Sequence, residues 1–213
     1  MSGGIDLEQG LAELGLALPA AAVERLRAYA RLLEKWNRVY NLTAIREPDR
    51  IVTHHLLDSL GVLPHVVGPR LADVGAGAGL PGIPLAIAAP ALDVTLIESN
   101  QKKCAFLAQV RMELALDNVH VECGRVQDHR PKFCYKTLIC RAFSRVPEFL
   151  RDARHLALAG GVLLAMKGTY PADELRGLPA GLKLEAVVPL RVPGLDAERH
   201  LVIVRALEGA QQP

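Results

Sequence analysis

The chain has 213 residues, half of them hydrophobic, and its 25 Lys and Arg against 23 Asp and Glu give a formal net charge of +2. A domain of this size buries about 70% of the surface that its unfolded chain exposes, so no second domain is required. The most apolar stretch, residues 83–92, contains two prolines and is too short to cross a bilayer. The first six residues lack the features of a secretory signal, so we expect a cytoplasmic protein with no membrane partner.

The first third of the chain is predicted to be helical. In residues 20–40, Val23, Leu26, Ala30 and Leu33 recur three or four positions apart and charged residues take the other side, which indicates an amphipathic helix. A second helix is expected from Pro48 to about Leu63. We therefore expect a helical extension over residues 1–66 that forms one structural unit with a domain over residues 67–213.

Strands and helices alternate in the second part of the chain. Predicted strands cover residues 70–74, 93–98, 119–122, 137–140 and 161–166, and predicted helices follow Gly79 and cover residues 101–116 and 146–158. This alternation predicts an α/β fold, a parallel sheet with helices on both faces. Two final apolar stretches, residues 184–192 and 200–206, read as a hairpin that adds an antiparallel strand.

Three glycines follow the first predicted strand. Gly75, Gly77 and Gly79 would let the backbone approach a ligand closely, because a Cβ there would block it. Asp73 lies near the carboxyl end of this strand, two residues before the first glycine, and Glu98 ends the next one, where a carboxylate can accept hydrogen bonds from both hydroxyls of a ribose. The pattern predicts a nucleotide-like cofactor and fits NAD and S-adenosylmethionine alike. The alternative is that the glycines only permit a tight turn.

Two prolines help to decide between NAD and S-adenosylmethionine as the cofactor. Residues 77–82 match the dinucleotide pattern G-x-G-x-x-G, but Pro81 and Pro84 remove backbone donors where a pyrophosphate would bind. S-adenosylmethionine has no phosphate, and its ammonium group suits a nearby carboxylate such as Asp73. The sequence therefore favours S-adenosylmethionine over NAD.

Basic residues are concentrated between residues 125 and 155, a segment that contains eight Lys or Arg and three acidic residues. Arg125, Arg141 and Arg145 follow predicted strand ends, and ligands of open α/β sheets bind at that edge. A local basic face is sufficient to bind phosphate. The alternative is an ordinary solvated surface.

Metal and disulfide chemistry are not indicated. Cys104, Cys123, Cys134 and Cys140 include no C-x-x-C pair, so we expect ordinary buried thiols. The neighbouring residues His54 and His55 cannot both face one metal ion, and we expect one to be buried near the cofactor and the other exposed.

Five motifs carry a family resemblance. In chain order they are LLEKWNRVYNLTAIREP, HHLLDSL, DVGAGAGLPGIPLAI, CRAFSRV and AMKG. Together they resemble the glucose-inhibited division protein B family of bacterial ribosomal RNA guanine-N7 methyltransferases, from about Leu32 to Val204. The resemblance implies a class I, Rossmann-like methyltransferase domain with a mostly parallel seven-stranded sheet and an antiparallel C-terminal strand. It implies S-adenosylmethionine as methyl donor and one guanine of 16S ribosomal RNA as target. We expect a monomeric enzyme that acts on this RNA within a small-subunit particle, and naked RNA is the alternative substrate.

The resemblance also implies cofactor contacts at five positions, namely Gly75, Leu80, Val126, Gln127 and Arg141. The family usually has an acidic residue where this chain has Gln127. If the cofactor is bound there by the backbone N–H, the difference matters little, whereas an interaction that needs a carboxylate could not form.

Guanine N7 already carries an in-plane lone pair, so the reaction removes no proton from the nucleophile. We therefore expect no general base and nominate no catalytic residue; the enzyme has to align the reactants. Arg141 is expected to hold the cofactor carboxylate or an RNA phosphate. Arg145, Arg151 and Lys167 are the expected RNA contacts.

Three polar residues have open roles: Asn41 and Thr43 suit either a turn or a substrate contact, and Asp58 is expected to bond to the loop after Asp73. A protein that binds S-adenosylmethionine and RNA without catalysis is the alternative function.

Overall fold

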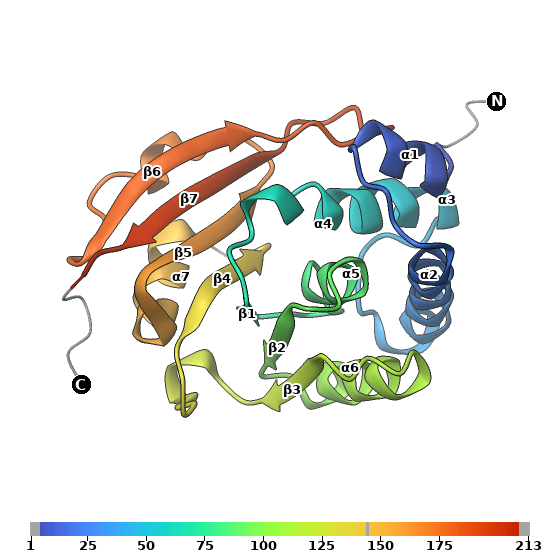
Figure 1. Ribbon diagram of the computed structural model, residues 1–213, viewed down its shortest axis with the longest axis horizontal. Coiled ribbons are helices and arrows are strands. Elements are labelled where there is room, and N and C mark those ends of the chain that lie inside the picture. Colours follow the sequence, from blue (N-terminus) through green and yellow to red (C-terminus); the bar gives the residue numbers. More distant parts are fainter. Residues whose placement is uncertain (1–4, 144, 209–213) are drawn as a thin grey trace.

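A seven-stranded sheet forms the centre of the molecule (Figure 1). The structure, a computed structural model, describes residues 5–143 and 145–208. The strands are β1 (Arg70–Val74), β2 (Asp93–Glu98), β3 (Val119–Cys123), β4 (Tyr135–Arg141), β5 (Ala157–Lys167), β6 (Leu182–Pro189) and β7 (His200–Ala206). Their order is β3-β2-β1-β4-β5-β7-β6, in which β1 to β5 are parallel and β7 is antiparallel to both β5 and β6. The expected α/β fold with antiparallel C-terminal strands is confirmed.

Helices cover both faces of this sheet. They are α1 (Leu7–Glu13), α2 (Ala20–Tyr40), α3 (Pro48–Ile51), α4 (Asp58–Leu60), α5 (Gly82–Ala88), α6 (Gln101–Glu113) and α7 (Val146–Ala153), with a π-helical segment (Val52–Leu57) between α3 and α4. Figure 1 shows α2, α5 and α6 on one side of the sheet and α7 on the other. Helix α2 has the bounds that its apolar spacing predicts.

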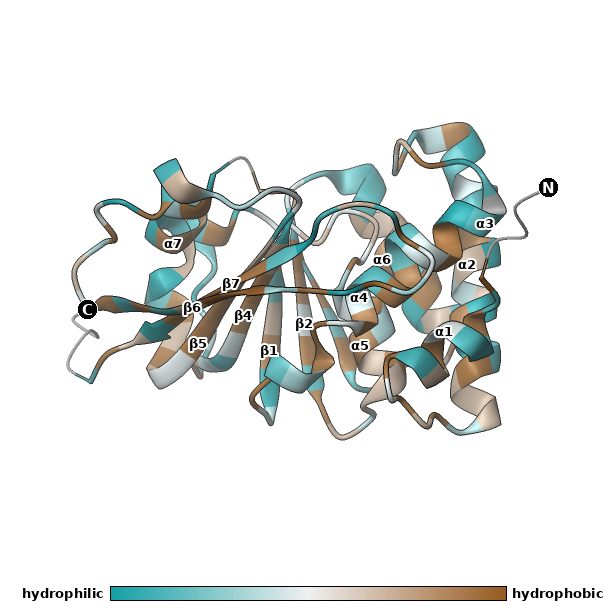
Figure 2. Cartoon of the chain, turned by 90° about the horizontal axis from the view of Figure 1, so that it is seen from above, coloured by the Kyte–Doolittle hydropathy of each residue, from teal (hydrophilic) through white to brown (hydrophobic). Residues whose placement is uncertain are grey.

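Each face of the sheet has its own hydrophobic core. On one face the fully buried Leu33 of α2 belongs to the same cluster as Ile83 of α5 and Phe106 of α6. On the other face Phe149 of α7 packs with Leu138 and Leu163 of the sheet. Figure 2 shows the apolar strands between the two helical layers. The N-terminal helices thus share a core with the sheet. Among the described residues, no helix is both long enough and apolar enough to cross a membrane.

The polypeptide departs from the expected elements before β5. The predicted helix 146–158 ends at Ala153, and β5 begins at Ala157. Gly160 has a φ of +65°, and a Cβ on Gly161 would lie 2.7 Å from the carbonyl oxygen of Leu158. The two glycines therefore form an irregularity within the strand rather than the loop that precedes it.

The expectation of four ordinary thiols is wrong. Cys104, in the first turn of α6, and Cys123, at the end of β3, form a disulfide with their Cα atoms 5.9 Å apart. Helix α6 runs back along the sheet to the start of β3, so the end of β3 lies beside the first turn of α6. Cys140 is buried as expected.

Candidate cofactor and substrate site

The glycine turn after β1 is held against β2. Gly75, Gly77 and Gly79 have φ values of +69°, +60° and +88°, which L side chains rarely adopt. The N–H groups of Gly75 and Ala76 both donate to the carbonyl oxygen of Ile97, at 2.9 and 3.0 Å. A Cβ on Gly79 would also lie 2.6 Å from Ile83 Cγ1. The turn therefore exposes backbone at the carboxyl end of β1, as the sequence indicates.

Glu98 fixes this turn from the end of β2. Its side chain is buried, and its two oxygens accept hydrogen bonds from the N–H groups of Gly77 and Asn100, each at 2.8 Å. The carboxylate thus connects the glycine turn to the start of α6. A carboxylate has about four lone-pair positions, so acceptor capacity for a ribose remains. The ribose contact stays a prediction.

Asp73 lies fully buried beneath the turn. Its Oδ2 accepts a hydrogen bond from the N–H of Gly82 at 2.8 Å, whereas its Oδ1 has no hydrogen-bond partner among the described residues. Burial raises the pKa of Asp73 to about 7, and the Gly82 hydrogen bond and the positive charge of Arg141 oppose this rise. An unpartnered buried carboxylate oxygen is uncommon and fits a cationic ligand group. Because Asp73 already occupies the start of α5, this helix is poorly suited to a pyrophosphate.

Next to the turn lies a cleft of about 470 Å³, which we call the cofactor cleft. It is lined by Val74, Gly75, Ile97, Ser99, Gly124, Arg125, Val126, Gln127 and Phe143. Three of the residues expected to contact a cofactor, Gly75, Val126 and Gln127, therefore face one cavity. The side chain of Leu80 is instead buried in the core. The Gln127 amide donates to Asp152 Oδ2 at 2.8 Å, so a cofactor contact at this position would use the backbone.

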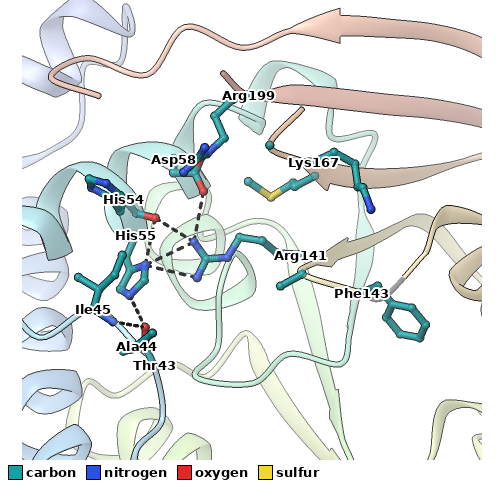
Figure 3. Close-up of a pocket in the computed structure, with 13 residues that line it drawn as sticks. Thr43, Ala44, Ile45, His54, His55, Asp58, Arg141, Phe143, Lys167 and Arg199 are labelled. Atoms are coloured by element: carbon teal, nitrogen blue, oxygen red, sulfur yellow. Dashed lines mark hydrogen bonds and ion pairs between the residues drawn. The ribbon is translucent and has the colours of Figure 1, made fainter. Parts of the chain in front are cut away.

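A second cleft of about 460 Å³, which we call the substrate cleft, begins at Phe143. Its lining residues are Thr43, Ala44, Ile45, His54, His55, Asp58, Arg141, Ala142, Phe143, Met166, Lys167, Gly168 and Arg199 (Figure 3). They come from the loop after α2, the π-helical segment, the start of α4, the ends of β4 and β5, and the segment before β7. Both clefts thus lie at the carboxyl ends of the parallel strands, where open α/β sheets bind ligands.

A buried carboxylate organises the substrate cleft. Asp58 accepts hydrogen bonds from Arg141 Nη1 at 3.2 Å and from Arg199 Nε at 3.0 Å, and Arg141 also donates to the carbonyl oxygen of His54 at 3.0 Å (Figure 3). The expectation that Asp58 bonds to the loop after Asp73 is therefore wrong. Two guanidinium groups share one carboxylate, so this cluster keeps a positive charge that suits an anionic ligand group.

The two histidines differ in burial. His55 is buried, and its Nε2 lies 2.9 Å from the hydroxyl of Thr43. Burial and, second, the charge of Arg141 lower the pKa of His55 to about 4. His54 is half-buried, and burial followed by the charge of Arg50 lowers its pKa. Both imidazoles are therefore neutral at pH 7.

The remaining polar candidates lie in different settings. Asn41 ends α2 with a φ of +49°, which supports the turn role. Lys167 Nζ pairs with Glu174 at 2.9 Å, so its charge is already partly compensated. Arg145 is exposed at the start of α7, and the exposed Arg151 lies 3.2 Å from Asp152. Within the described part of the chain, no group of three or more His, Cys, Asp or Glu side chains has the arrangement of a metal site.

Among the lining residues that the sequence did not single out, Phe143 and Arg199 matter most. Phe143 belongs to the CRAFSRV motif, whose arginines alone were considered, and Arg199 lies in the tail that was assigned only to a hairpin. Nothing in the sequence signals that Arg199 reaches Asp58.

Solved structures with a similar fold define the class. They include the glycopeptide N-methyltransferase MtfA in complex with S-adenosylmethionine, with a TM-score of 0.58 and 14% identity over 73% of this chain and 88% of that chain. TrmN from Thermus thermophilus has a TM-score of 0.55 and 18% identity over 70% of this chain and 48% of that chain. The fold is that of the S-adenosylmethionine-dependent methyltransferases.

Sequence comparison then gives the family. The family model described as rRNA small subunit methyltransferase G matches residues 22–202. A ribosomal RNA small subunit methyltransferase G from Aromatoleum aromaticum is 57% identical over 93% of this chain and 96% of its own length, and one from Chromobacterium violaceum is 52% identical over 92% and 95%. The chain belongs to the rRNA small subunit methyltransferase G (GidB) family, as its motifs indicated.

Proposed function

We propose that this protein transfers a methyl group from S-adenosylmethionine to N7 of one guanine in 16S ribosomal RNA, as a single chain acting on a small-subunit particle. Family membership supports ribosomal RNA methylation. The observation that carries the N7 assignment is the state of the substrate cleft: Asp58 is bound by two arginines, and burial keeps His55 neutral and bonded to Thr43. This lining suits a nucleophile that needs no deprotonation.

The cofactor cleft fits S-adenosylmethionine. We assign its adenine to the backbone near Val126 and Gln127, which line this cleft. We assign its ribose to Glu98 and its ammonium group to Asp73 Oδ1, at the ends of the neighbouring strands β2 and β1. We assign its carboxylate to Arg141, which lines the substrate cleft, so the cofactor would extend from one cleft to the edge of the other. The unpartnered oxygen of Asp73 and the side-chain-free turn at Gly75 support this fit. When bound, S-adenosylmethionine supplies an electrophilic methyl group on a sulfonium.

The residues of the chain then have an orienting role. The glycine turn, fixed by Glu98 and Ile97, and the Asp58 cluster hold the two clefts in a set relation, so that N7, methyl carbon and sulfur can lie in line. Alignment of this kind removes a large part of the activation barrier of a displacement reaction, and it needs no base. No proton leaves the nucleophile, and the purine becomes cationic as the sulfonium is neutralised.

The first prediction concerns pH. With cofactor and RNA saturating, the single-turnover rate is expected to stay nearly flat between about pH 6 and 9, because no base takes part. Cofactor affinity should instead fall by about tenfold per pH unit below 7. Burial raises the pKa of Asp73 to about 7, so protonation below that pH removes the charge that the ammonium group needs. Rapid-quench kinetics and calorimetry at several pH values measure the two quantities.

The raised pKa of Asp73 also makes the stability of the fold depend on pH. A carboxyl with a raised pKa in the folded protein stabilises the fold most at low pH, and this contribution is lost as pH rises through 7.

In Asp73→Asn the pH dependence of cofactor affinity should disappear. A rate that rises tenfold per pH unit through the histidine range, and loses that rise in His54→Gln or His55→Gln, would show a general base and contradict the N7 assignment.

The second prediction concerns the RNA face. Arg145→Glu or Arg151→Glu is expected to weaken binding to the small-subunit particle and to lower the slope of log affinity against log salt by about one for each phosphate that is no longer neutralised. Cofactor affinity should stay nearly unchanged. Filter binding at a series of salt concentrations measures the slope, and Arg38→Glu on the exposed side of α2 is the matched control. Equal slopes for variant and wild type would assign both arginines to an ordinary solvated surface.

Methyl transfer itself tests the proposed function. We expect S-adenosylmethionine labelled in its methyl group to mark the 16S RNA of small-subunit particles, and to leave large-subunit particles unmarked. Cofactor binding and RNA binding without any transfer would favour the alternative, a non-catalytic binding protein.

A further inference from the structure

Phe143 lies at the junction of the two clefts. It lines both the cofactor cleft and the substrate cleft. Arg141, two positions earlier, reaches the Asp58 cluster, whereas the Phe143 ring projects from the loop after β4 (Figure 3). Between them Ala142 has a φ of +58°. Left-handed backbone is uncommon outside glycine and gathers at functional sites, where it aims particular side chains.

The surroundings of the ring hold it in place without covering it. Phe149 of α7 packs against it with ring centroids 5.8 Å apart and an interplanar angle of 56°. The ring also lies 3.7 Å from the point where a Cβ on Gly75 would be, so it faces the bare backbone of the glycine turn. The side chain remains partly exposed. A half-buried aromatic ring that is packed on one side and exposed on another can stack against a planar group.

In-line transfer places the reacting atoms beside this ring. If the cofactor occupies one cleft and the base the other, the bond that forms crosses the boundary between them, and that boundary is Phe143. The substrate base also has to leave its helix. In A-form RNA, N7 faces a deep and narrow groove that side chains cannot enter, whereas unpaired bases stack on aromatic side chains. A walled cleft of about 460 Å³ suits one such base.

We propose that the Phe143 ring is the stacking surface for the target guanine, which enters the substrate cleft as an unpaired, unstacked base. This inference rests on the proposed function, because it names how the same site takes its substrate. Phe143 acts as a positioning residue: it holds the plane of the base so that N7 points at the cofactor cleft.

Substitutions test the requirement for an aromatic face. Phe143→Leu keeps an apolar side chain and removes the aromatic ring. We expect its single-turnover rate on small-subunit particles to fall about 5- to 150-fold, because this range corresponds to the free energy of stacking one base on an aromatic side chain. Phe143→Tyr and Phe143→Trp should keep the rate within a few-fold of wild type. Because Phe143 also lines the cofactor cleft, all rates are compared at saturating S-adenosylmethionine. The matched control is Phe133→Leu, an exposed ring that precedes the start of β4, at the opposite end of that strand from Phe143.

A photo-crosslink gives a readout that does not depend on activity. With the photoreactive p-benzoylphenylalanine in place of Phe143, we expect a crosslink to one nucleotide of 16S RNA, the same one that the wild-type enzyme methylates; at Phe133 we expect none there. An unchanged rate in Phe143→Leu at saturating cofactor, an equal loss in Phe143→Tyr, or a crosslink elsewhere would each overturn the proposal. Absence of methyl transfer by the wild-type protein would instead overturn the proposed function.

Discussion

Replacing Glu98 with alanine is expected to lower the affinity for S-adenosylmethionine by at least about 100-fold. The substitution removes the acceptor for the N–H groups of Gly77 and Asn100, and each hydrogen bond to a charged group contributes roughly 1.5–3 kcal/mol. The glycine turn would lose its anchor to α6, and the cofactor ribose would lose its carboxylate. Titration calorimetry with S-adenosylmethionine measures the change.

Two variants sharpen this test. Glu98→Gln keeps one acceptor oxygen without the charge and should give an intermediate affinity. Glu122→Ala removes an exposed carboxylate from the neighbouring strand β3 and should bind like wild type. If Glu98→Ala binds with wild-type affinity, the ribose assignment is wrong, and a preference of the wild-type protein for NAD would contradict the class of cofactor.

Replacing Asp58 with alanine is expected to destabilise the protein by about 3–5 kcal/mol, because it leaves Arg141 and Arg199 without their shared buried carboxylate. For a chain of this length the melting temperature should fall by roughly 6–20 °C. Cofactor affinity should fall as well, since Arg141 would no longer be held in one orientation. Thermal unfolding followed by circular dichroism measures the first effect.

The control for the Asp58 substitution is a substitution in a solvent-exposed ion pair. Asp173 and Arg176 lie 3.9 Å apart and are both highly exposed, so Asp173→Ala should change stability by less than about 1 kcal/mol. Asp58→Asn keeps an acceptor oxygen and should lie between the two. A melting temperature for Asp58→Ala equal to that of Asp173→Ala would show that the buried cluster does not support the fold.

Local patterns predicted those parts of the structure that depend on neighbours in sequence. The glycine spacing after β1 indicated the tight turn, since each positive φ depends on the residue type at that position. The strands β1, β2 and β7 have the bounds that their apolar stretches indicate. Helix α2 was recognised from its period alone.

Long-range pairings could not be predicted in this way. Asp58 meets Arg141 and Arg199 across 83 and 141 residues, and charged residues give no sign of which distant partner they bind. The disulfide between Cys104 and Cys123 depends on how α6 packs along β3, which the spacing of the cysteines does not reveal. Glu98 was correctly placed at the end of β2, but its bonds to the turn depend on the three-dimensional fold.

The position of the methyl group within the RNA tests the central claim most directly. After incubation with S-adenosylmethionine and small-subunit particles, the 16S RNA can be treated with borohydride and aniline, which cleave the chain at 7-methylguanosine. We expect a single new cleavage, at one guanine, that is absent without the protein or with Glu98→Ala. Transferred label with no enzyme-dependent cleavage would place the methyl group on another atom and contradict methylation at guanine N7.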